Sequence, residues 1–210
     1  MKSAIFDMDG TLLDSMREWD ALNSNLLLSL GVTPPDDLNE IMKEMSVDTA
    51  LTYLMENFGL WETREELSLQ LQEQIHLMYR DRVEMKPGVK EYLDKLKKEG
   101  IPFGIATATP KKYAIEALTR LGIADMFEFI ICEDDVGKDK HFPDLYLEAA
   151  RRLGTEPADT TIFEDAAYAA RTAKAAGFDL CVIEDKSFVN RKEELLKLAD
   201  RYILSFEELL

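Results

Sequence analysis

Short apolar runs alternate along most of the chain with longer stretches in which apolar residues recur at helical spacing. The apolar runs predict strands at residues 3–6, 101–107, 127–132, 160–163 and 179–183, and a weaker strand at 202–204. The helical spacing predicts helices at residues 88–100, 110–122, 143–154 and 166–177. Strands and helices that alternate in this way form a parallel sheet with helices on both faces. We therefore predict an α/β fold built on a doubly wound parallel sheet.

One long segment interrupts this alternation directly after the first predicted strand. Residues 16–85 show helical periodicity but no convincing strand. Within the segment, Thr63 followed three residues later by Glu66 predicts a capping box at the start of a helix. The segment is far longer than an ordinary loop. We predict a core domain of residues 1–15 and 86–210, interrupted by an α-helical cap domain.

The composition is that of an ordinary globular protein, but the charge balance is strongly acidic. The 210 residues are 46% hydrophobic and 31% charged, and 41 acidic against 25 basic residues give a formal net charge of -16. Such a field repels polyphosphate backbones and anionic membrane surfaces, so we expect neither nucleic acid nor a membrane as a partner. A phosphorylated small molecule would have to be held by local positive groups or by a cation.

The start of the chain and its cysteines bear on the cellular compartment. The opening MKSAIFDMDG reaches acidic residues too soon for a signal peptide, and no window is apolar enough for a membrane span. Cys132 and Cys181 both lie inside apolar runs, which is typical of small buried side chains rather than of a redox pair. We expect a cytoplasmic protein, with a monomer favoured.

Polar side chains follow the predicted strands at the points where the strands end. Because the carboxyl ends of parallel strands share one edge of a sheet, we expect these side chains to meet in a crevice there. They are Asp7 and Asp9 after the first strand, Thr107 and Thr109 after the second, Lys138 and Lys140 in the loop after the third, and Glu164 and Asp165 after the fourth.

Four carboxylates cannot share a crevice without compensation, because like charges repel. Mg2+ would compensate them, since it takes oxygen ligands and typically binds a few carboxylates together with a phosphate. Zinc is a poor candidate because the chain has no cluster of Cys and His. We predict that His76 and His141 are structural or surface residues. Lys140 and Thr107 would bind the remaining phosphate oxygens.

The two aspartates after the first strand can divide the chemistry. A carboxylate beside Mg2+ can attack phosphorus and form an aspartyl-phosphate, which is the role predicted for Asp7. A second carboxylate can protonate the leaving oxygen and then take a proton from the attacking water, which is the role predicted for Asp9.

At these residues the chain resembles the haloacid dehalogenase superfamily of phosphotransferases over essentially its whole length. The stretch DMDGTLLDS matches the opening motif of that superfamily, and IATAT, GKDKHFPD and FEDAAYAARTAKAAG resemble the three motifs that follow. Within the third motif, the spacing to Pro143 and Asp144 selects Lys140 over Lys138. His141, where Pro is frequent, and Ala166 and Ala169, where Ser and Gly are usual, depart from the pattern without removing a charged group.

The resemblance implies a Rossmann-like core and a role for each matching residue. Asp7 is implied as the nucleophile, and Asp9 as the acid/base that also ligates the metal through its backbone carbonyl. Thr107 is implied in phosphate binding, and Glu164 and Asp165 are implied at the metal. The helical insertion is implied to be the small cap that covers the site and selects the substrate. Together these expectations describe a Mg2+-dependent phosphatase acting on a small phosphate monoester.

Four other functions remain as alternatives. A mutase resembling β-phosphoglucomutase would carry a cap histidine near Trp19 and an arginine near Val47, and this chain has neither. A true dehalogenase would not need Asp9 or the metal-binding acids. A signalling receiver domain has its acceptor on a middle strand and no use for a lid, and a catalytically dead binding protein would not need every charged role filled.

The cap residues Trp19, Tyr53, Trp61 and Met45 could line a specificity pocket or form the core of the helical bundle.

Overall fold

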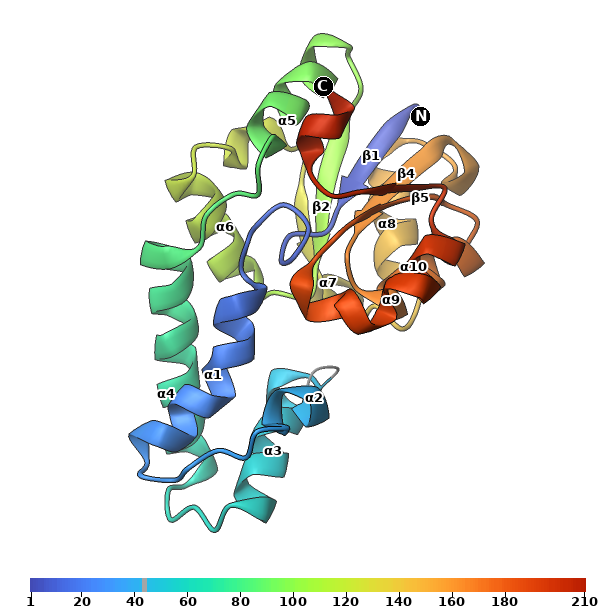
Figure 1. Cartoon of the computed structure of the whole chain (residues 1–210). Helices are drawn as coiled ribbons and strands as arrows, with labels where there is room; N and C mark the ends of the chain where they lie inside the picture. The colour runs from blue at the N-terminus through green and yellow to red at the C-terminus, as the bar shows by residue number, and fades with distance from the viewer. Residues whose placement is uncertain (43–44) are drawn as a thin grey trace. The chain divides into compact units, whose positions relative to one another are not determined.

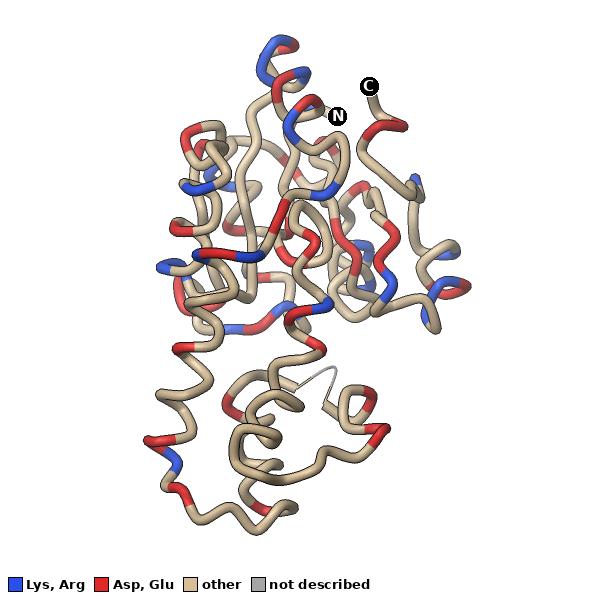
Figure 2. The backbone as a smooth tube through the Cα atoms, turned by 60° about the vertical axis from the view of Figure 1, so that its left-hand side comes forward, with Lys and Arg blue, Asp and Glu red and all other residues tan. Residues whose placement is uncertain are grey.

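The structure, a computed structural model, describes residues 1–42 and 45–210 and divides the chain into two compact units. Unit 1 comprises Met1–Met16 and Val83–Leu210, and unit 2 comprises Arg17–Arg82. Figure 1 shows the chain coloured from its N-terminus to its C-terminus, and Figure 2 marks the acidic and basic residues along the backbone.

Unit 1 is built on a six-stranded sheet in which every neighbouring pair of strands is parallel. The order across the sheet is β3-β2-β1-β4-β5-β6. The strands are β1 (Ser3–Phe6), β2 (Phe103–Thr107), β3 (Ile130–Cys132), β4 (Thr160–Glu164), β5 (Asp179–Ile183) and β6 (Arg201–Ile203). The predicted doubly wound parallel sheet is confirmed. Strand β3 is shorter than its apolar run: its register with β2 begins at Ile130, although the Glu128 amide already donates to the Phe103 carbonyl over 2.9 Å.

The four helices predicted between the strands are present, together with shorter elements that were not predicted. The α-helices of unit 1 after the return from unit 2 are α5 (Val89–Lys98), α6 (Lys111–Arg120), α7 (Glu133–Val136), α8 (Asp144–Leu153), α9 (Ala167–Ala175) and α10 (Lys192–Leu198). Short 3-10 turns are η2 (Ala124–Met126), η3 (Pro157–Asp159), η4 (Lys186–Arg191) and η5 (Phe206–Leu209). Helix α10 buries Leu195 but no other residue, so its apolar periodicity is too weak to identify it from the sequence.

The two faces of the sheet have different cores because successive side chains of a strand point to opposite faces. On one face Ile5 and Ile162 pack against the small and apolar residues of α8 and α9. On the other face the rings of Phe6 and Phe163 stack with centroids 4.5 Å apart, and Tyr92 of α5 packs beside them. All four residues of β1 are buried, as expected for a central parallel strand.

Unit 2 is helical over the part that the structure describes. Its elements are α1 (Met16–Ser29), α2 (Leu38–Met42), α3 (Val47–Asn57) and α4 (Arg64–Leu77), followed by the π-helical turn η1 (Met78–Arg82). The capping box at Thr63 is confirmed: the Glu66 amide donates to Thr63 Oγ1 over 3.3 Å, and the Thr63 amide donates to Glu66 Oε2 over 2.9 Å. Trp61 is 97% exposed and is therefore not part of the bundle core.

Two further sequence predictions concern burial and membranes. Cys132 and Cys181 are buried and form no disulfide, so the interpretation as buried thiols is confirmed. None of the described helices combines the length and apolar character needed to cross a bilayer.

Candidate active site

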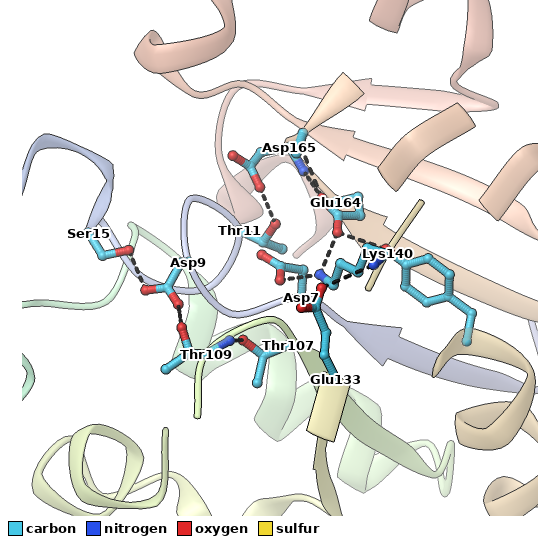
Figure 3. Close-up of polar contacts among 12 residues, drawn as sticks. Asp7, Asp9, Thr11, Ser15, Thr107, Thr109, Glu133, Lys140, Glu164 and Asp165 are labelled. Carbon is cyan, nitrogen blue, oxygen red and sulfur yellow. Dashed lines mark hydrogen bonds and ion pairs between the residues drawn. The ribbon is translucent and has the colours of Figure 1, made fainter. Parts of the chain in front are cut away.

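Three acidic side chains meet where β1 and β4 end. The two strands are in register, with Phe6 opposite Phe163, and the Asp7 amide donates to the Phe163 carbonyl over 3.0 Å. Asp7 therefore emerges beside Glu164 and Asp165. One ligand atom from each of these three acids lies within 4.8 Å of the others, and all three side chains are buried. Figure 3 shows them converging from two adjacent strands.

A single buried lysine neutralises part of this acidic cluster. Lys140 is only 2% exposed, and its Nζ donates to Asp7 Oδ1 and, over 2.6 Å, to Glu164 Oε1. The backbone amide of Lys140 donates to Glu133 Oε1 over 3.0 Å, and this bond anchors the loop that carries Lys140. Residues that are distant in sequence thus meet here, with the ammonium group of Lys140 between the carboxylates of Asp7 and Glu164.

Lys138 and His141, which lie in the same loop as Lys140, are outside the acidic cluster. Lys138 is half-exposed and forms an ion pair of 3.0 Å with Asp144. His141 is also half-exposed and stacks on the ring of Tyr168, with centroids 4.6 Å apart. The metal-capable group found among the described residues contains neither His141 nor His76.

Glu164 is the most completely bonded of the three acids. Its Oε1 accepts from Lys140 and from the Tyr146 hydroxyl, the latter over 2.8 Å. Its Oε2 accepts from the backbone amides of Asp165 and Ala166, over 2.9 and 3.0 Å. These bonds orient Glu164 toward Lys140, so a metal ion bound directly by Glu164 would have to replace one of them.

Asp165 has the opposite arrangement, with one oxygen left over. Its Oδ1 accepts from the Thr11 hydroxyl over 3.0 Å. Its Oδ2 is buried and has no hydrogen-bond partner among the described residues. Gly10 faces this oxygen with a φ of +81°, and a Cβ added there would collide with it. A buried carboxylate oxygen without a partner is costly unless a cation completes its coordination.

The electrostatics of the cluster also favour a cation. Burial raises the pKa of Asp7 to about 7, although the nearby Lys140 ammonium acts in the opposite direction. Burial likewise raises the pKa of Asp165, and the neighbouring charges of Glu164 and Asp7 raise it further. Three carboxylates against one ammonium leave an excess of negative charge, which a divalent ion with oxygen ligands would neutralise. The donor set and the charge therefore fit such an ion.

Asp9 points away from the three acids and is held by two hydroxyl groups (Figure 3). Ser15 Oγ donates to Asp9 Oδ1 over 2.6 Å, and Thr109 Oγ1 donates to Asp9 Oδ2 over 2.6 Å. The side chain of Asp9 is thus outside the carboxylate cluster. Thr107, buried at the end of β2, accepts the Thr109 amide on its own hydroxyl oxygen over 3.0 Å.

Four further residues, to which the sequence assigned no role, form hydrogen bonds with the residues of the site. Thr11 and Ser15 lie inside the motif that begins at Asp7, so their proximity to the acids could have been noticed. Tyr146 lies in the apolar pattern of α8, and Glu133 starts the short helix α7; neither carries a sequence signal for the site. Their roles depend on side-chain orientation, which periodicity does not predict.

Comparisons with known proteins agree with this architecture. A family model described as haloacid dehalogenase-like hydrolase matches residues 4–183. The phosphorylated carbohydrates phosphatase of Thermotoga maritima is 29% identical over 179 residues, which are 85% of this chain and 83% of that protein. The beta-phosphoglucomutase of Bacillus subtilis is 31% identical over 186 residues, which are 84% and 80% of the two chains. The crystal structure of CbbY from Rhodobacter sphaeroides in complex with phosphate has a TM-score of 0.82 and 25% identity, covering 100% of this chain and 96% of that one.

Proposed function

This chain belongs to the family of haloacid dehalogenase-like hydrolases and is a phosphatase-like enzyme, and we propose that it hydrolyses a small phosphate monoester through an aspartyl-phosphate on Asp7. The observation that carries the proposal is the buried contact of Asp7 with Lys140, beside the unpartnered oxygen of Asp165. A nucleophile, a phosphate-binding cation and a free metal-ligand position thereby lie at one sheet edge.

The first half of the reaction forms a bond between Asp7 and phosphorus. A carboxylate oxygen of Asp7 attacks the phosphoryl group in line, and the bond to the alcohol oxygen breaks. Asp9 gives its proton to that leaving oxygen. To do so, Asp9 has to exchange at least one of its two hydroxyl partners, Ser15 and Thr109, for the substrate.

The second half returns the enzyme to its starting state. Asp9, now a carboxylate, takes a proton from a water molecule, and the resulting hydroxide attacks phosphorus. The bond to Asp7 breaks, and inorganic phosphate leaves. Throughout, Lys140 and the Thr107 hydroxyl bind non-bridging phosphate oxygens, which carry the charge of the transition state. Burial of Lys140 strengthens this interaction because little water screens it.

Mg2+ is the proposed cofactor. Asp7 and Asp165 would hold it through carboxylate oxygens and Asp9 through its backbone carbonyl, with Glu164 at the edge of the ligand set. The support is the all-oxygen donor set and the free Asp165 Oδ2. When bound, the ion lowers the repulsion between Asp7 and the phosphate dianion.

We expect Asp165→Asn to weaken the binding of Mg2+ rather than to unfold the protein. Losing one charged ligand should raise the Mg2+ concentration for half-maximal activity by at least tenfold, on the order of the effect of altering a metal's ligand shell. Hydrolysis of p-nitrophenyl phosphate, titrated with Mg2+ after treatment with a chelator, measures this. Asp159→Asn is the matched control, because Asp159 is a partly exposed aspartate that directly precedes β4 at the opposite end of the strand, and it should leave the Mg2+ titration unchanged. An unchanged titration in Asp165→Asn would contradict the assignment.

The relatives indicate which class of leaving group to test first. The named relatives include a phosphatase of phosphorylated carbohydrates and a mutase, so a sugar phosphate is the first substrate class to test. We also propose that unit 2 is the cap that selects among such substrates.

The second candidate function is a sugar phosphomutase, and the relationship to beta-phosphoglucomutase favours it. A mutase has to exclude water and hold a sugar phosphate in two orientations, which calls for basic and polar groups in the cap. At the two positions where the resemblance would place such groups, the chain has Trp19, whose Nε1 is bonded to the Tyr79 hydroxyl over 3.1 Å, and the apolar Val47. Neither supplies a cation or a proton.

We therefore expect phosphate release without isomerisation. The protein is incubated with Mg2+ and hexose 1-phosphates, and inorganic phosphate and hexose 6-phosphate are followed together. The same assay is run with small non-sugar monoesters to find the preferred class. Phosphate formed in step with substrate loss supports the phosphatase, whereas catalytic formation of the 6-phosphate without phosphate release would establish the mutase instead.

A further inference from the structure

The chain returns from unit 2 along the loop that follows β1. Residues 84–86, which we call the return segment, run antiparallel to the end of that loop. The Lys86 amide donates to the Leu12 carbonyl over 2.9 Å, and the Asp14 amide donates to the Glu84 carbonyl over 2.9 Å. The return segment is thus bonded to the same loop that carries Asp9.

The side chain of Lys86 ties the return segment to the neighbourhood of β5. Its Nζ lies 2.8 Å from Asp185 Oδ2 and 3.1 Å from the Glu184 carbonyl oxygen, and the side chains of Lys86 and Asp185 are only 10% and 7% exposed. The other oxygen of Asp185 accepts the Ser187 amide over 2.9 Å. Both partners are therefore fixed in position, unlike the members of a surface ion pair.

These contacts close a ring around the carboxyl edge of the sheet. Asp185 follows β5, which pairs with β4, and β4 leads into Asp165. Asp165 accepts the Thr11 hydroxyl, and Thr11 adjoins Leu12, whose carbonyl accepts the Lys86 amide. Lys86 then returns to Asp185 through its ammonium group. The ring passes through the loop of Asp9 and through Asp165, so it connects the two acids that point in different directions in the site.

We propose that Lys86 is a positioning residue for Asp9 and Asp165, acting through this ring without touching the substrate. The inference rests on the proposed function and names a residue outside the four motifs. A nearly buried ion pair contributes little net stability, because desolvation offsets much of the attraction between its charges. What the ion pair contributes is position: the short contacts of Lys86 fix the distance between the loop of Asp9 and the end of β5.

The test compares Lys86→Met with Lys86→Arg and with a matched control. Methionine keeps the unbranched stem but removes the charge and the donors, whereas arginine keeps both. The control is Lys2→Met, because Lys2 forms an ion pair of 2.9 Å with Asp159 in the same unit but is largely exposed and lies at the start of β1. Asp185→Asn provides a second way to weaken the ring while keeping Lys86.

Three properties are measured for each variant. Hydrogen exchange without Mg2+ reports the protection of amides in residues 10–14, calorimetry reports Mg2+ affinity, and p-nitrophenyl phosphate hydrolysis reports kcat and KM. For Lys86→Met we expect faster exchange in residues 10–14, about tenfold weaker Mg2+ binding and roughly a thirtyfold lower kcat at similar KM, in the range of other residues that support metal ligands. Lys86→Arg should recover most of the loss, and Asp185→Asn should resemble Lys86→Met. Lys2→Met should match the wild type in all three.

Two results would overturn the proposal. One is a Lys86→Met protein that melts at a lower temperature but keeps wild-type exchange in residues 10–14 and wild-type Mg2+ affinity. The other, should Lys86→Met not fold, is an Asp185→Asn protein with those same wild-type properties. A wild-type protein that neither binds Mg2+ nor hydrolyses phosphate esters would refute the proposed function instead, and the exchange measurement would still decide whether Lys86 orders the loop.

Discussion

Asp7→Asn should lower kcat for phosphate-ester hydrolysis by roughly ten-thousandfold or more, the scale seen when a covalent nucleophile is removed. The amide of asparagine is a poor nucleophile and cannot be released as a carboxylate in the second step. The substitution also removes one negative charge from a buried cluster in which Asp7, Glu164 and Asp165 face a single lysine. Because burial already disfavours the charged form of Asp7, the variant should fold at least as stably as the wild type.

The matched control for this variant is Asp14→Asn. Asp14 lies in the same loop but is exposed, and its backbone amide, rather than its side chain, bonds to the return segment. Steady-state kinetics with p-nitrophenyl phosphate should give a near-wild-type kcat for Asp14→Asn, and circular dichroism should show both variants folded. A folded Asp7→Asn protein that retains more than about a hundredth of the wild-type kcat would rule out Asp7 as the nucleophile.

Lys140→Ala should cost about a thousandfold in kcat/KM, whereas Lys138→Ala should change it by less than about threefold. The two lysines are two residues apart, yet their surroundings differ completely. Lys140 is buried between Asp7 and Glu164, and its ammonium is the positive side chain of the cluster. Although burial opposes its charge, those two carboxylates raise the pKa of Lys140 above its usual value, so it stays charged. Lys138 pairs with Asp144 in the open, where solvent screens it.

The comparison needs a check on folding, because Lys140→Ala leaves buried carboxylates without their partner. Thermal melting is measured for both variants, and Lys140→Arg serves as a third protein that keeps the charge with a different shape. Partial recovery of kcat/KM in Lys140→Arg would attribute the loss to charge. If Lys138→Ala proved the more damaging substitution, the assignment of the lysine loop would be wrong by two positions.

The fold could be predicted from the sequence largely because its strands are buried on both faces. A run such as SAIF, followed at once by Asp7, has no surface-facing residues to blur its ends, and β1 has the predicted bounds. The elements that were not predicted are short or weakly amphipathic. Helix α7 has four residues, and α10 buries Leu195 alone, so hydrophobic periodicity could not identify either.

For the site, sheet topology predicts which strand ends meet but not how side chains share their hydrogen bonds. The convergence of Asp7, Glu164 and Asp165 follows from adjacent parallel strands. That Glu164 is fully bonded while Asp165 keeps a free oxygen does not follow, because it depends on Tyr146 and Thr11 reaching across from α8 and from the first loop. Sequence patterns carry no information on such orientations.

The central claim is that the phosphoryl group is carried by Asp7, and trapping that species tests it most directly. Asp9→Asn removes the base that activates water, whereas p-nitrophenolate leaves without needing a proton. Mixing Asp9→Asn with Mg2+ and p-nitrophenyl phosphate should therefore release about one p-nitrophenolate per enzyme in a burst, and acid-quenched peptide mass spectrometry should find one phosphoryl group on Asp7. The double variant Asp7→Asn with Asp9→Asn should show neither. Steady turnover without a burst, or a phosphoryl group on any other residue, would contradict the account.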